Sequence, residues 1–257
     1  MQSKSISLLL FGFLICLFWN HPIAADYVRP PYVSEDVWNK LSPYFLPENF
    51  PEKAILDKAF SRRQVLKSIK SMIKSGFFII TNPKNKIIVA KHIRMQNYLI
   101  KVYLDGSPGP VWDCWLRRVQ GAQMIQKGIN LHGYQSIMKV PRKWIYPLPY
   151  SATANAESKH FILVVDKINI LNDKKNRGAY KRKMTPELLD ALYSMLTEYK
   201  LIDSVYPDNV PFCRDGKLAF VDTEYAGGTA QPVPLGAVKR YLSKSMSAYW
   251  EQLISQQ

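Results

Sequence analysis

The chain has 257 residues, of which 47% are hydrophobic, so it can bury a substantial core, and the composition excludes a disordered or low-complexity protein. It carries 35 Lys and Arg against 20 Asp and Glu, for a formal charge of +15. Such a balance suits an anionic partner, such as a nucleotide, an acidic protein or a membrane surface, or serves solubility alone, and no strong nucleic-acid motif accompanies it. Its three cysteines and four histidines have no metal-ligand spacing, which excludes a zinc-finger-type protein and a disulfide framework.

The first 25 residues have the pattern of an export signal. Lys4 precedes the apolar run Ile6–Trp19, and small residues end the segment at Ala24 and Ala25. A spanning helix needs about 17–25 apolar residues and the core of a signal peptide about 7–15, so the run favours export. We predict a signal peptide over residues 1–25, cleaved after Ala25, and a secreted or extracytoplasmic protein. An uncleaved anchor is the alternative.

Residues 26–60 are rich in proline and aromatic residues, which predicts an irregular arm on the surface. The segment Ser61–Gly76 predicts one amphipathic helix, because Ser61 and Gln64 form a capping-box pattern and Gly76 follows the last apolar residue.

Three β-rich segments follow, at Phe77–Thr81, Ile87–Lys91 and Tyr98–Tyr103. They predict a three-stranded meander. Lys101 lies between apolar residues of the third segment, and the alternation of a strand lets its side chain face away from theirs.

The segment Val111–Gly128 predicts a helix with apolar residues at helical spacing. We interpret the basic residues of this helix, Arg117, Arg118 and Lys127, as a solvated face.

The second half of the chain alternates strand-like and helical segments. The run FILVV within His160–Ile168 predicts a strand that is buried on both faces. The remaining predictions are a strand at Ser136–Val140, a charged loop at Asn172–Lys183, and helices at Thr185–Lys200 and Gly236–Ser255.

The most informative stretch is residues 202–224, IDSVYPDNVPFCRDGKLAFVDTE. Asp215 and Gly216 form a hairpin-turn signal between two short apolar runs, so the stretch predicts a β-hairpin. Asn209 and Asp222 lie at its two ends, with Glu224 just beyond. A plain hairpin with solvated acidic ends is the alternative interpretation.

In order and spacing, these segments resemble the protein-kinase-like fold of protein kinases and aminoglycoside-type phosphotransferases. The resemblance implies an α+β, two-lobed protein with a β-rich small lobe and a trimmed helical large lobe. The implied divisions are a signal peptide at 1–25, an N-terminal extension at 26–75, the small lobe at 76–168 and the large lobe at 169–257, with the metal and catalytic hairpin at 202–224.

The resemblance also implies a set of site residues. Lys101 falls where a kinase carries its phosphate-contacting lysine, and Gln123 lies near the place of the glutamate that pairs with that lysine. Asn209 and Asp222 fall at the metal-binding positions, with Glu224 as a further oxygen ligand. The implied cofactors are ATP and magnesium.

The usual catalytic aspartate is missing from its expected place. That position holds Ser204, and Asp203 lies one residue earlier. Because a serine cannot serve as the same base, Asp203 and Asp222 are the candidate catalytic residues.

Three functions remain open at this point. The chain is an exported pseudokinase that binds a nucleotide, an atypical phosphotransferase that uses Asp203 or Asp222, or a basic secreted module that binds an anionic partner and has no nucleotide site. Because Cys114 and Cys213 fall in different implied lobes, we expect both thiols to be free.

Overall fold

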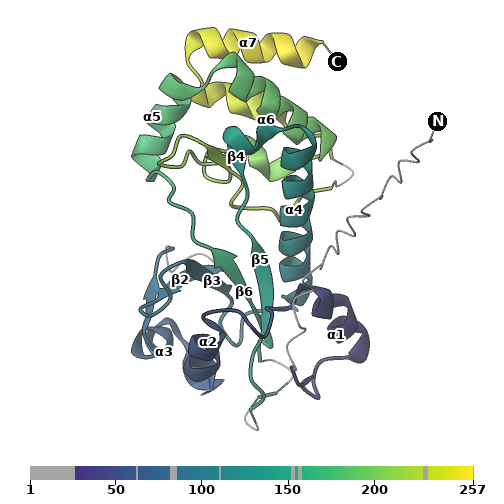
Figure 1. Ribbon diagram of the computed structural model, residues 1–257, viewed down its shortest axis with the longest axis vertical. Helices are drawn as coiled ribbons and strands as arrows, with labels where there is room; N and C mark the ends of the chain where they lie inside the picture. The colour runs from purple at the N-terminus through teal and green to yellow at the C-terminus, as the bar shows by residue number, and fades with distance from the viewer. Residues whose placement is uncertain are drawn as a thin grey trace, which may run out of the picture.

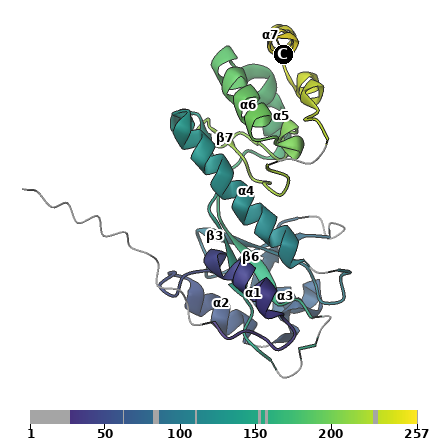
Figure 2. The ribbon, with the colours of Figure 1, turned by 90° about the vertical axis from the view of Figure 1, so that its right-hand side faces the viewer.

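A computed structural model describes residues 27–61, 63–81, 86–109, 111–151, 154–155, 158–227 and 231–256. The expected signal peptide lies outside these residues. The protein is α+β: an antiparallel sheet with helices α1–α3 lies at one end, and helices α5–α7 lie at the other (Figure 1). Helix α4 runs from one end toward the other, as Figure 2 shows. No helix of the described part is long and apolar enough to cross a membrane.

The α-helices are α1 (Glu35–Leu41), α2 (Lys53–Phe60), α3 (Ile69–Lys74), α4 (Trp112–Leu131), α5 (Asp173–Lys183), α6 (Pro186–Glu198) and α7 (Lys244–Ser255). The strands are β1 (Phe77–Ile79), β2 (Ile88–His92), β3 (Tyr98–Val102), β4 (Met138–Lys139), β5 (Lys143–Pro147), β6 (Phe161–Asp166) and β7 (Leu218–Ala219). Short 3-10 helices are η1 (Ser42–Tyr44), η2 (Arg63–Lys67), η3 (Tyr134–Ser136), η4 (Ile202–Val205) and η5 (Leu235–Tyr241).

The main sheet has five antiparallel strands in the order β1-β2-β3-β6-β5. The predicted meander is confirmed as β1, β2 and β3. The FILVV run forms most of β6, and all five of its residues are buried, as predicted for a strand covered on both faces. Strand β5 has no counterpart among the predicted segments.

Residues 27–60 do not form an irregular surface arm. They form α1 and α2, and six of their apolar residues are buried in the cores around the sheet: Val33, Leu41, Leu46, Phe50, Leu56 and Phe60. The earlier prediction was wrong because the prolines lie between or at the start of these helices, where a missing N–H costs little.

Two segments that were predicted as single helices are each broken by a serine. Ser68 caps α3 by accepting a hydrogen bond from Ser71 N at 3.1 Å, which separates α3 from η2. Ser243 caps α7 by accepting from Met246 N at 3.3 Å, which separates α7 from η5. In both places the side chain satisfies an amide at a new helix start, so the apolar pattern continues across a break. Gly76 ends α3 in the left-handed region, at φ +89°, as predicted.

The charged segment Asn172–Lys183 forms α5, so its prediction as a loop was wrong. The Asn172 side chain accepts from Lys175 N at 3.0 Å and caps the helix. Ala179 and Tyr180 are buried in the core of the helical end, which anchors one face of an otherwise charged helix. The following helix, α6, was predicted, and Thr185 caps it.

The predicted hairpin is present, with less strand than expected. Its turn is at Gly216, at φ +88°, and Cys213 N donates to Lys217 O at 2.8 Å across it. Further along, Val221 N donates to Asn209 O at 2.9 Å. This ladder holds the loop of Asn209 beside the segment that carries Asp222.

Candidate functional site

Two lysines of the sheet point at the last residues of the hairpin stretch 202–224. Lys101 on β3 is opposite Leu163, and Lys143 on β5 is opposite Val165. Leu163 and Val165 are two residues apart on β6, so both lysines lie on the same face of the sheet. Their ammonium groups donate to one acceptor, Val221 O, at 3.4 Å from Lys101 and 3.3 Å from Lys143.

Helix α4 contributes an arginine to the same place. Arg118 Nη1 lies 2.5 Å from Asp222 Oδ1, and Arg118 Nη2 lies 2.6 Å from Glu224 Oε2. The residue is only 4% exposed, so the interpretation of Arg118 as solvated surface was wrong. Its Nε also donates to Cys114 Sγ at 3.4 Å, one helical turn earlier. One guanidinium therefore joins both candidate metal ligands of the tripeptide at 222–224.

A threonine and a glycine let α4 approach this segment closely. Thr223 Oγ1 donates to Arg118 O at 2.6 Å and accepts from Lys143 Nζ at 2.5 Å. A Cβ at Gly121 would lie 2.0 Å from Thr223 O, so any side chain there would push the helix away. The geometry of the arginine and the two carboxylates therefore depends on this packing.

A second arginine lies at the edge of the cluster. Arg117 Nη2 is 2.9 Å from Glu224 Oε1, and its other terminal nitrogen pairs with Asp113. The Arg117 side chain is 42% exposed, whereas the Arg118 side chain is 5% exposed. Glu224 thus bridges one buried and one accessible guanidinium.

The charges of the cluster perturb one another strongly. Burial tends to raise the pKa of Asp222, but Arg118, then Lys101, outweigh it and lower this pKa to about 2. Burial is also the main reason that the pKa of Lys101 falls to about 8, with a further contribution from Arg118. Burial, then repulsion by Lys101, lowers the pKa of Lys143 well below its usual value. The site therefore holds an ionised aspartate and two lysines whose charged forms are disfavoured.

The predicted loop residues lie beside this cluster. Asn209 Nδ2 donates to Asp203 O at 2.7 Å, so the asparagine fixes the loop that carries Asp203. The pKa of Asp203 is raised by burial and then by the negative charges of Asp222 and Glu224. Of the predicted site residues, Lys101, Asp203, Asn209, Asp222 and Glu224 thus come together.

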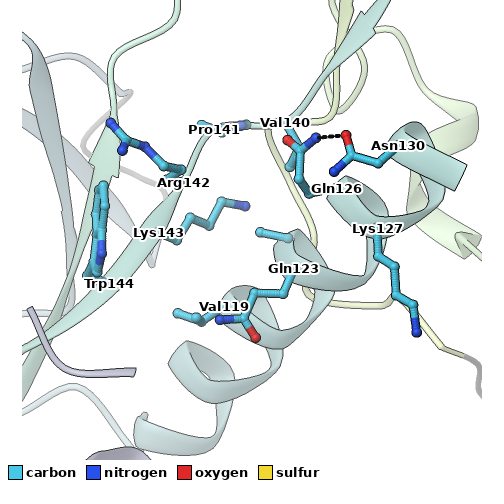
Figure 3. A pocket seen from close by; sticks show the side chains of 11 residues that line it. Val119, Gln123, Gln126, Lys127, Asn130, Val140, Pro141, Arg142, Lys143 and Trp144 are labelled. Carbon is cyan, nitrogen blue, oxygen red and sulfur yellow. Dashed lines mark hydrogen bonds between the residues drawn. The ribbon is translucent and has the colours of Figure 1, made fainter. Parts of the chain in front are cut away.

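Gln123 does not join them. It is exposed on α4 and lines a cavity of about 490 Å³ between α4 and the start of β5, together with Lys127, Arg142 and Trp144. Figure 3 shows this cavity, into which Lys143 extends from β5. Arg118, and not Gln123, is the residue of α4 that reaches the cluster.

The cluster does not fit a divalent cation. A magnesium ion needs free carboxylate or carbonyl oxygens, but Arg118 engages both Asp222 and Glu224. Asp222 is also under the influence of Lys101 and Lys143, which would repel a dication. Among the described residues, no group of three or more His, Cys, Asp or Glu side chains could hold a metal ion.

The comparisons with known proteins give little further guidance. No protein-family model and no curated protein matches the sequence. Among solved structures, the protein is similar to a chain in the complex of Rv3197 with erythromycin from Mycobacterium tuberculosis, at 16% identity and a TM-score of 0.34. The match covers 78% of this chain and 56% of that chain. A likeness this weak assigns neither a fold family nor a ligand.

Proposed function

We propose that this protein is a kinase-like, nucleotide-binding protein with the two-lobed organisation of that fold. Three features support the proposal: the order of the five strands in the sheet, the position of α4 after β3 and before β5 in the sequence, and the hairpin that follows α6 in the sequence. In this proposal the sheet and α4 belong to the small lobe, and α5 to α7 belong to the large lobe. The site binds the phosphates of ATP through Lys101.

One observation carries the proposal. Lys101 and the segment of Asp222 are about 120 positions apart, yet Lys101 Nζ lies 3.4 Å from Val221 O and the charges of Lys101 and Asp222 act on each other. A lysine and an aspartate brought together from a strand and a hairpin form the core of a phosphate-handling site.

Binding without efficient transfer is the favoured form of this function. Asp222 is held by Arg118, and the position of the usual base is a serine, Ser204. Asp203 is the candidate to orient an attacking hydroxyl if transfer occurs, and burial and the nearby carboxylates of Asp222 and Glu224 raise its pKa. Incubation with γ-labelled ATP distinguishes the two forms, since a phosphotransferase releases or transfers label and a pseudokinase does not.

A second function rests on a different observation. Helix α5 exposes basic residues along most of its length: Lys174, Lys175, Arg177, Lys181, Arg182 and Lys183. Such a helix suits an anionic protein or membrane surface, and the expected export would place it outside the cytoplasm. Retention on anionic vesicles that falls steeply with salt, and persists when Lys101 is replaced, would favour this function.

The test is thermal unfolding of the purified protein with increasing ATP, beside Lys101→Met and the exposed control Lys127→Met. A ligand that binds only the folded state stabilises it by about 2.7 kcal/mol at a hundredfold excess over Kd. We expect stabilisation of the wild type and the control, and none of Lys101→Met. The proposal fails if ATP leaves the wild-type transition unchanged.

A further inference from the structure

We infer that the guanidinium of Arg118 takes the place of a divalent cation in this site, so that the protein binds the phosphates of its nucleotide without magnesium. The nucleotide part of this inference rests on the proposed function. The part that concerns the cation stands on the geometry of α4 and the tripeptide at 222–224.

The position of Arg118 is the first step of the argument. Its two terminal nitrogens reach one oxygen of Asp222 and one oxygen of Glu224, at 2.5 and 2.6 Å. These are the two carboxylates that would otherwise bind a metal ion. A guanidinium suits this role because its planar fork presents two donors to two acceptors while carrying a permanent charge.

The arginine is built into the fold. It is 4% exposed, its Nε contacts Cys114, and its backbone oxygen accepts from Thr223. Gly121, one turn later on α4, allows the contact because a Cβ there would collide with Thr223 O. Moving Arg118 out would leave Asp222 and Glu224 without their buried cation, which is strongly unfavourable.

The remaining charges supply what a phosphate needs. Lys101 and Lys143 share the carbonyl of Val221, which is a weak competitor for an ammonium compared with a phosphate oxygen. Arg117 adds a partly exposed guanidinium at the edge of the cluster. A nucleoside di- or triphosphate would therefore meet organic cations from β3 and α4, and a dication would meet those same cations as repulsive neighbours.

The first experiment uses manganese, without nucleotide, as a paramagnetic probe. We measure free Mn²⁺ by electron paramagnetic resonance in titrations of the wild type, Arg118→Gln and the control Lys127→Gln, an exposed position of α4 outside the cluster. We expect no saturable binding to the wild type or the control, and a gain of at least about tenfold in affinity when Arg118→Gln releases Asp222 and Glu224. Saturable binding to the wild type that Asp222→Asn abolishes would overturn the inference, as would a folded Arg118→Gln variant with no gain.

The second experiment needs no variant, so it decides even if Arg118→Gln does not fold. We compare the Kd of ATP for the wild type in EDTA and in excess magnesium, and expect the two values to agree within about threefold. Binding that is at least about tenfold tighter with magnesium would overturn the inference. If ATP binds in neither condition, the proposed function and the nucleotide part fail together, while the manganese titration still decides the role of Arg118.

Discussion

Replacing Lys101 with methionine should stabilise the protein, although it removes a residue of the site. The folded state lowers the pKa of Lys101 from 10.5 to about 8, mainly by burial. A pKa unit corresponds to about 1.4 kcal/mol, so holding this ammonium charged costs at most about 3.5 kcal/mol below pH 8. Methionine has a similar length and no charge, and Val221 O keeps the hydrogen bond from Lys143. We therefore expect a gain of about 1–3 kcal/mol in the free energy of unfolding at pH 7.

The stability gained by Lys101→Met should depend on pH. A lysine whose folded-state pKa is lowered destabilises the fold while both states are protonated, and the penalty disappears as pH rises from about 8 to 10.5. Urea unfolding at pH 7 and pH 10 measures the difference between the wild type and Lys101→Met, with Lys127→Met as an exposed control. The advantage of the variant should shrink at pH 10. A variant that is less stable at pH 7, or an advantage that is independent of pH, would refute the reasoning.

Three further predictions concern the packing and charges of the site. Arg118→Met should cost about 3–5 kcal/mol in urea unfolding because it leaves two carboxylates without a buried partner, whereas Arg117→Met should cost less than about 1 kcal/mol; equal losses would contradict the burial argument. Gly128→Ala should lower the free energy of unfolding by about 1–3 kcal/mol, because its Cβ would lie 2.6 Å from the ring of Tyr199. In the control Gly236→Ala the Cβ meets nothing within 4 Å, so the free energy of unfolding should change by less than about 0.5 kcal/mol. The pKa of Asp222 is lowered to about 2, so its ionised form contributes stability above pH 4 that is lost as pH falls through 2. Acid unfolding of the wild type should therefore show a loss of about 2 kcal/mol that Asp222→Asn lacks. Parallel acid profiles of the two proteins would contradict an ionised, paired aspartate.

The sequence predicted the convergence of Lys101, Asn209 and Asp222 only through its resemblance to the kinase-like fold. The residues themselves predicted one part of it, a hairpin whose length places Asn209 and Asp222 at its two ends. The hydrogen bond from Val221 N to Asn209 O is the direct result of that hairpin length.

The role of Arg118 could not be deduced in the same way, because burial of a charge depends on what packs against the helix. A signal was nonetheless present. Arg118 follows Trp115 by three residues and precedes Ala122 by four, so it lies on the buried stripe of α4, and only its charge argued for solvent. Lys143 was missed for a related reason, since a buried lysine interrupts the apolar pattern that identifies a strand.

The fold was predicted best where local signals were strong. The buried run of β6 and the capped helix α6 were found. Helix α5 was missed because its charged sequence resembles a loop, and three buried residues, Asn176, Ala179 and Tyr180, anchor it. The helices α1 and α2 were missed because the apolar residues of this segment are spread between prolines, and their burial requires the sheet to be present.

The most direct test of the central claim is calorimetric titration of ATP into the wild type, Lys101→Met and Lys127→Met. We expect one saturable site in the wild type and in Lys127→Met, and no binding to Lys101→Met. Since Lys101→Met should be the more stable protein, loss of binding there could not be ascribed to unfolding. Equal binding by all three proteins, or binding by none, would contradict the account.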